Sequence, residues 1–110
     1  MIVKIDNYGE KGENYFVEYK VSELSLDQMN FLKDNLSEEC EIAEDILKIK
    51  MYFDERLYPF HSDIAKIRID DFIAREEIEM NIFLSSFLEE MKLEYFFSQF
   101  YICADYKKLN

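Results

Sequence analysis

The chain has 110 residues, of which 49% are hydrophobic and 16% aromatic, and its net charge is −11. Disordered chains are poor in aromatic residues and rich in proline and glycine, so one proline and two glycines predict a folded protein. The length predicts a single globular domain over residues 1–110. The negative charge argues against nucleic acids and anionic membranes, which bind clustered lysine and arginine. It favours a basic protein partner.

The cysteines and the N-terminus indicate the compartment. Cys40 and Cys103 stand alone without a CxxC pair, so they predict neither a zinc site nor a disulfide framework. The start of the chain, MIVKIDNYGE, lacks the basic and long apolar regions of a signal peptide. We therefore expect a cytoplasmic protein with reduced thiols and no cofactor.

The first predicted element is a β-hairpin. Residues 1–5 are apolar with high β-propensity, and residues 15–21 place Tyr15, Val17 and Tyr19 on one face by strict alternation. Residues 7–14 hold both glycines and predict a longer loop between the strands. The GEKG in this loop does not fit a phosphate-binding loop, because neither GK[ST] nor an immediately following helix is present.

A helix and an acidic run follow the hairpin. Ser25 is a favourable N-cap, and Gln28 stands at the spacing of a capping box. Met29, Leu32 and Leu36 then form an apolar stripe. Residues 37–45, SEECEIAED, contain five acids and no base, and this run predicts either a loop or a short helix.

Two later stretches alternate as strands do. In ILKIKMYF, residues 46–53, every second side chain is a large apolar one. In IAKIRI, residues 64–69, apolar side chains alternate with Lys66 and Arg68. We expect these two stretches to form a second antiparallel pair.

From Met80 the apolar residues recur with the period of a helix. Residues 93–104 also have helical spacing, with a phase shift at Lys92, although their residue types suit a strand too; a kinked or restarted helix is the favoured interpretation. The order β-β-α-β-β-α predicts an α+β fold, a mostly antiparallel sheet covered by helices with an aromatic C-terminal element. The aromatic residues expected to pack in the core are Tyr95, Phe96, Phe97, Phe100 and Tyr101.

Catalytic candidates are few. His61 is the only histidine, and with Asp63 it offers an oriented base or part of a metal site. Asp70 and Asp71 offer paired carboxylates for Mg²⁺, but acids in this position are explained more simply as the first turn of a helix. Because no partner nucleophile or metal-ligand spacing is identifiable, we expect a protein that is not an enzyme.

The acidic run is the strongest candidate for an interaction surface. A solvated face explains it without function. Alternatively, its acids meet the lysines and arginines of a nuclease active site, where they stand in place of phosphates. Asp54 and Glu55 extend the run, and exposed Tyr52 and Tyr58, with Tyr8 as a further candidate, serve as anchors. The predicted partner-binding residues are Glu38, Glu39, Glu41, Glu44, Asp45, Tyr52, Asp54, Glu55 and Tyr58.

A small, acidic, motif-free protein resembles, in physical type only, the bacterial immunity proteins that neutralise toxic nucleases. Phage-encoded inhibitors of host defence enzymes share this profile. The sequence therefore predicts an inhibitor that occludes the active site of a basic toxin. The alternative is a structural or regulatory subunit of a larger complex, marked by a large exposed apolar patch.

Overall fold

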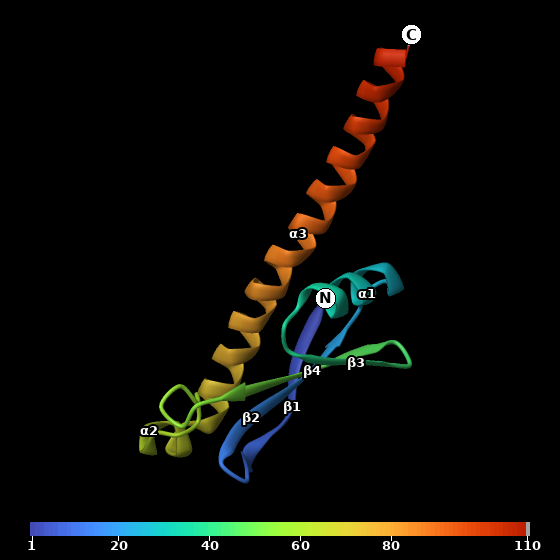
Figure 1. The fold of residues 1–110 in the computed structure, drawn as a ribbon. Helices are drawn as coiled ribbons and strands as arrows, with labels where there is room; N and C mark the ends of the chain where they lie inside the picture. Colours follow the sequence, from blue (N-terminus) through green and yellow to red (C-terminus); the bar gives the residue numbers. More distant parts are fainter. Residues whose placement is uncertain (110) are drawn as a thin grey trace.

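Over residues 1–109 the chain forms a four-stranded antiparallel sheet and three helices (Figure 1). The computed structural model describes the backbone of residues 1–109 and the side chains of residues 1–94. The strands lie in the order β1-β2-β4-β3, and the predicted α+β class is confirmed. The observed order β-β-α-β-β-α-α roughly matches the predicted β-β-α-β-β-α, with one further helix. In chain order the elements are β1 (Ile2–Lys11), β2 (Asn14–Ser22), α1 (Leu26–Asn35), β3 (Glu39–Ala43), β4 (Ile46–Phe53), α2 (Asp63–Ile67) and α3 (Ile69–Leu109).

The first hairpin has longer strands than its sequence predicts. β1 continues to Lys11 and turns at Gly12 and Glu13, so the expected loop over residues 7–14 is wrong. Gly12 has a φ of 65°, which glycine adopts without steric cost. A register shift between Ile5 and Asn7 marks a β-bulge, which increases the twist of the strand.

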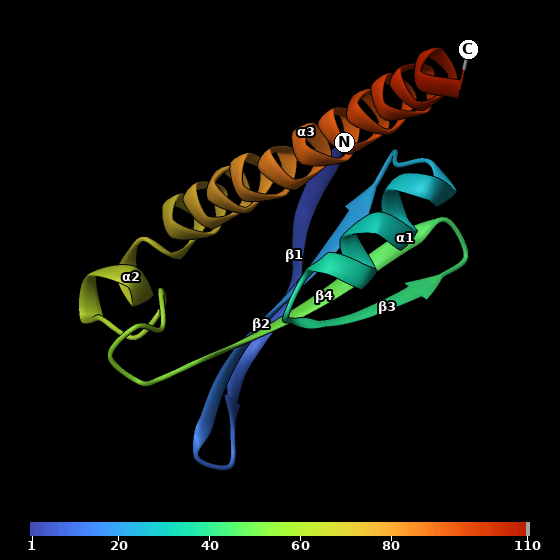
Figure 2. The same ribbon diagram turned by 45° about the horizontal axis from the view of Figure 1, so that its top comes forward.

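One face of the sheet is apolar, because side chains alternate along each strand. Val17 and Val21 of β2 and Leu47 of β4 are fully buried. Both α1 and α3 pack on this face (Figure 2). The helices contribute Met29, Leu32, Leu36, Met80 and Leu84 to the same core.

Helix α1 begins where the sequence predicts. The Gln28 N–H donates to Ser25 Oγ at 3.1 Å, and the Ser25 N–H donates to Gln28 Oε1 at 2.9 Å. This reciprocal arrangement satisfies two backbone donors that a helix N-terminus otherwise leaves unpaired. The predicted capping box is confirmed.

The acidic run over residues 37–45 contains strand β3, so the expected loop or short helix is wrong. Cys40 and Ile42 pack against the core, whereas Glu39 and Glu41 are exposed. This is the two-residue period of a strand. Glutamate is rare in strands, and β3 forms here because β4 provides a partner with complementary charges.

The predicted strand over residues 64–69 is also wrong. This segment forms α2 and the first residue of α3, and the Ala65 N–H donates to Ser62 Oγ at 3.1 Å, which makes Ser62 the N-cap. β4 already pairs with β2 on one side and β3 on the other, so it offers no free edge to a further strand. Because residues 64–69 pair with no strand, their alternating apolar side chains do not form the apolar face of a strand. Ile67, for example, is 82% exposed.

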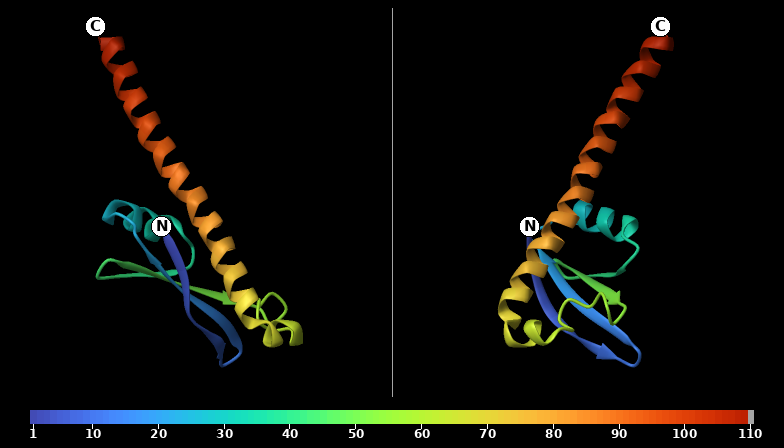
Figure 3. Two further views of the ribbon diagram at one scale, coloured as in Figure 1. Left: turned by 180° about the vertical axis from the view of Figure 1, so that it is seen from behind. Right: turned by 90° about the vertical axis from the view of Figure 1, so that its left-hand side faces the viewer.

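Helix α3 is continuous from Ile69 to Leu109, so residues 93–104 are helical but do not form a separate helix. Two further views show α3 passing the sheet and α1 and projecting beyond them (Figure 3). The molecule consequently measures 67 × 28 × 26 Å. In the described part of the chain, no helix has the length and apolar content needed to cross a bilayer. The aromatic side chains expected in the core, Tyr95, Phe96, Phe97, Phe100 and Tyr101, lie outside the described side chains.

Candidate partner-binding surface

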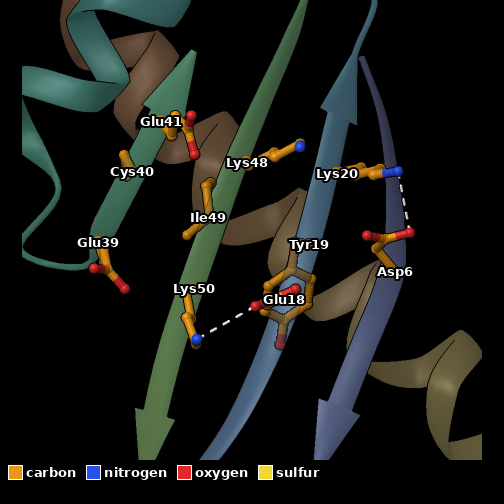
Figure 4. A pocket seen from close by; sticks show the side chains of 10 residues that line it. All are labelled: Asp6, Glu18, Tyr19, Lys20, Glu39, Cys40, Glu41, Lys48, Ile49 and Lys50. Carbon is orange, nitrogen blue, oxygen red and sulfur yellow. Dashed lines mark ion pairs between the residues drawn. The ribbon is translucent and has the colours of Figure 1, made fainter. Parts of the chain in front are cut away.

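The sheet face opposite the helices carries acids and lysines side by side (Figure 4). Glu39 of β3 is in register with Lys50 of β4, and Glu41 is in register with Lys48. Opposite charges at facing positions of antiparallel strands attract each other. Two of the acids in the run therefore have compensating charges within the sheet. They also leave β3 with a charged edge, which disfavours pairing with other chains.

Two ion pairs continue this pattern toward β1. Lys50 Nζ lies 3.3 Å from Glu18 Oε1, and Lys20 Nζ lies 3.1 Å from Asp6 Oδ1. Desolvation lowers the pKa of Lys50, but hydrogen bonding and attraction to Glu18 outweigh it, so that the pKa is raised. Because its acids and lysines are mixed, this face does not present the net negative charge of the chain.

Acids without this compensation gather at one end of β4. Tyr52 is 53% exposed there, and its hydroxyl donates to Glu39 Oε2 at 3.0 Å. Among the described side chains, the hollow beside Tyr52 is lined by Glu13, Asp54 and Glu55 and by no base. We call this region the Tyr52 surface, and it consists of Glu13, Asn14, Glu39, Tyr52, Asp54 and Glu55.

The register of the sheet assembles the Tyr52 surface. Phe16 of β2 is in register with Tyr52 of β4, so the β1–β2 turn lies beside the end of β4. This pairing brings Glu13 and Asn14 to the acids that follow β4. Sequence reasoning missed both residues, because only the β2–β4 pairing places them near Tyr52.

Asp54 and Glu55, the acids that follow β4, also make contacts within the chain. Asp54 Oδ1 accepts from the Arg56 N–H at 3.2 Å, an interaction that favours a turn. Glu55 Oε1 lies 3.5 Å from His61 Nε2. His61 thus neighbours the Tyr52 surface, while Asp63 belongs to the first turn of α2.

The other predicted acids lie elsewhere. Glu44 and Asp45 form the β3–β4 turn at the opposite end of β4 from Asp54 and Glu55. Eight residues of strand separate these two pairs by about 25 Å. The structure therefore brings Tyr52 together with Asp54 and Glu55 and, through its hydroxyl, with Glu39, and it keeps Glu41, Glu44 and Asp45 apart from this hollow. Glu38 is half-buried just before β3.

Tyr58 is not an exposed anchor. It is only 8% exposed, and its ring centroid lies 4.9 Å from that of Tyr15 and 5.6 Å from that of Phe60. Burial raises its pKa to about 12. The prediction of an exposed Tyr58 is wrong because the chain after β4 folds this residue back into the core. Tyr8 remains 38% exposed and packs against Phe60.

The remaining catalytic candidates have structural explanations. Asp70 and Asp71 lie in the first turn of α3, and Asp71 Oδ2 is 3.0 Å from a nitrogen of Arg68. Acids at this position interact favourably with the helix dipole. Among the side chains of residues 1–94, no three histidine, cysteine or acidic residues lie close enough together to hold a metal ion.

Comparison with known families identifies the family to which the chain belongs. Residues 2–90 match the family of unknown function DUF5750. A comparison with curated proteins found no match. The matched range includes the whole sheet and the Tyr52 surface, whereas residues 91–109, the last part of α3, lie beyond it.

Proposed function

The chain belongs to the DUF5750 family of unknown function, and we propose that it is an immunity-type inhibitor that binds a basic toxin and occludes its active site. The favoured target is a nuclease. The observation that most directly supports this proposal is the Tyr52 surface. There a half-exposed tyrosine lies beside a hollow lined by three acids and, among the described side chains, by no base. In this proposal the inhibitor acts in the bacterial cytoplasm, needs no cofactor and catalyses no reaction.

Charge complementarity supports a basic partner. Residues 1–90 carry 22 acids and 10 bases, a net charge of −12. Such a field speeds encounter with a positively charged cleft. Nuclease clefts hold lysine and arginine for phosphates, so carboxylates of Glu13, Asp54 and Glu55 are suitable replacements for those phosphates.

Pre-organisation supports Tyr52 as the anchor. Its hydroxyl is held by Glu39, and Lys50 Nζ lies 5.5 Å from its ring centroid. A side chain already held in one conformation loses less entropy on binding. Tyrosine is also enriched among the residues that dominate binding energy at interfaces.

The test is affinity capture from the native host. The tagged chain is used as bait, bound proteins are eluted along a salt gradient, and the eluted proteins are assayed for nuclease activity with and without the purified chain. We expect one basic enzyme, released at high salt and inhibited at equimolar ratio. A captured partner that is acidic, or whose activity the chain leaves unchanged, would refute the proposal.

A second function is favoured by a different observation. Ile78, Ile82 and Leu93 of α3 are 61%, 64% and 54% exposed. Several large apolar side chains exposed along one helix are typical of a surface that binds another protein. A structural or regulatory subunit would use this helix, and its capture would be insensitive to salt because apolar contacts are not screened.

A further inference from the structure

A small cavity lies between the end of β4 and α3, on the face of the sheet that the helices cover. Its volume is about 170 Å³, and its apolar walls are Met51 and Phe53 of β4 and Met80 and Phe83 of α3. Met51 and Phe53 alternate with Tyr52 along β4, so they face the helices whereas Tyr52 faces away from them. The cavity is therefore separate from the hollow beside Tyr52, although Phe53 borders both.

The cavity is lined by a buried tyrosine whose hydroxyl has no partner. Tyr19 of β2 is only 2% exposed, and its hydroxyl makes no hydrogen bond with the described residues. Every fully enclosed side-chain nitrogen or oxygen in the described part of the chain has a partner, so this hydroxyl reaches open space. Burial raises the pKa of Tyr19, and the charges of Glu76 and Glu79 raise it further, which places the hydroxyl on the α3 side of the sheet. A buried tyrosine hydroxyl usually has a hydrogen-bond partner, and a molecule in the cavity would supply one here.

One carboxylate of the cavity has no compensating base. Glu76 and Glu79 both line the cavity, and Glu79 Oε1 is paired with Arg75 Nε at 3.2 Å. Glu76 is half-buried and forms no ion pair with the described residues. Burial and the neighbouring Glu79 raise the pKa of Glu76, and attraction to Arg75 offsets this only in part. A positive charge in the cavity would relieve the repulsion between the two carboxylates.

We infer that this cavity binds a small arylalkyl ammonium ion, whose ring packs between the apolar walls and whose ammonium group donates to Glu76 and to the Tyr19 hydroxyl. Aromatic rings and methionine sulfur pack favourably against another ring, and aromatic faces attract cations. The volume limits the ligand, because a cavity of about 150 Å³ holds a benzene molecule. A benzene ring with a short ammonium arm therefore fits. This inference does not depend on the proposed inhibitor function.

The first test is calorimetric titration of the full chain with benzylammonium. Benzyl alcohol, which has a similar shape and no charge, is the matched ligand control. We expect one benzylammonium ion to bind per chain, about tenfold more tightly than benzyl alcohol, because hydrogen bonds to a charged group are the stronger ones. Equal affinities for the two ligands would overturn the inference, as would the absence of benzylammonium binding at every attainable concentration.

Two variants separate this site from the general negative charge of the chain. Glu76→Gln removes the carboxylate in the cavity, and Glu90→Gln removes a carboxylate at an exposed position of the same helix. We expect Glu76→Gln to weaken benzylammonium binding about tenfold and to leave benzyl alcohol binding unchanged, whereas Glu90→Gln changes neither. Tyr19→Phe should weaken benzylammonium binding about threefold, through the loss of one neutral hydrogen bond. Equal weakening by Glu76→Gln and Glu90→Gln would show attraction to the net charge and overturn the inference.

A further measurement locates the ligand. Met51 and Met80 line the cavity, whereas Met29 is buried on α1 away from it. In NMR spectra of the chain with isotope-labelled methionine methyl groups, benzylammonium should shift the Met51 and Met80 signals and leave the Met29 signal in place. Met51→Leu and Met80→Leu assign the two signals. Binding that leaves both of these signals unshifted would place the ligand elsewhere and overturn the inference.

Discussion

The backbone N–H of Ile5 donates to Oε2 of Glu77 at 2.8 Å, across 72 positions of sequence. In the described sheet β1 is an edge strand, and an unpaired edge attracts strands from other chains. One turn further along α3, Asn81 Nδ2 donates to the carbonyl of Met1 at 3.5 Å. Side chains of α3 thus occupy backbone groups on the free edge of the sheet.

Replacing Glu77 should destabilise the fold. We expect Glu77→Ala to lower the free energy of unfolding by about 1–2 kcal/mol, because the partly buried backbone N–H of Ile5 loses its carboxylate acceptor. The measurement is urea denaturation followed by circular dichroism. Glu89→Ala is the control, since it removes an exposed ion pair with Lys92 on the same helix, worth about 0.5 kcal/mol or less. Equal losses in the two variants would contradict a role for the Ile5 contact.

The capping box of α1 predicts a second local effect. Ser25→Ala should cost about 1 kcal/mol, because the Gln28 N–H loses its acceptor, Ser25 Oγ. Ser86→Ala serves as the comparison: its hydroxyl donates to the Ile82 carbonyl within α3, and alanine favours helix there. Denaturation curves of the two variants should separate, with Ser86→Ala at least as stable as the native chain. If Ser25→Ala also matches the native chain, the cap does not stabilise α1.

The environment of Glu76 predicts that the stability of the fold depends on pH. Burial raises the pKa of Glu76, and the charge and hydrogen bonding of Glu79 raise it further. A raised carboxyl pKa means that the folded state favours the protonated form. The resulting stability is fully present below the ordinary glutamate pKa of about 4.3 and is lost as pH rises through the folded value.

Glu76→Gln should therefore raise the Tm at pH 7 and change it less at pH 4. Thermal unfolding between pH 4 and pH 8 measures this difference. Glu90→Gln, at an exposed position of the same helix, is the control. A Glu76→Gln variant whose advantage grows toward low pH would have the wrong sign.

Two double variants, one at each end of β4, test whether binding depends on the Tyr52 surface or only on the net charge of the chain. Asp54→Asn with Glu55→Gln and Glu44→Gln with Asp45→Asn remove the same two charges. The first pair should slow association with the captured enzyme by about tenfold and lower the salt needed for elution, because it alters the Tyr52 surface. Association rates are measured by surface plasmon resonance. If the two double variants slow association equally, the net charge of the chain, and not the Tyr52 surface, determines the association rate.

Patterns among neighbouring residues in the sequence were sufficient to predict several helices and strands. The capping box at Ser25 and Gln28 identified the start of α1, and the alternation of large apolar residues identified β2 and β4. These signals work because helix caps and strand faces depend on residues a few positions apart. The composition likewise indicated a folded acidic protein before any contact was known.

Strand pairing and burial were decided only by the tertiary structure. β3 and residues 64–69 both have short alternating patterns, yet β3 pairs with β4, whereas residues 64–69 pair with no strand of the described sheet and are helical. The register of β2 with β4 brings Glu13 to Tyr52, and the chain after β4 buries Tyr58. Each outcome depends on residues distant in sequence, whose contacts no local pattern encodes. The fold class was therefore readable from the sequence, whereas the composition of the Tyr52 surface was not.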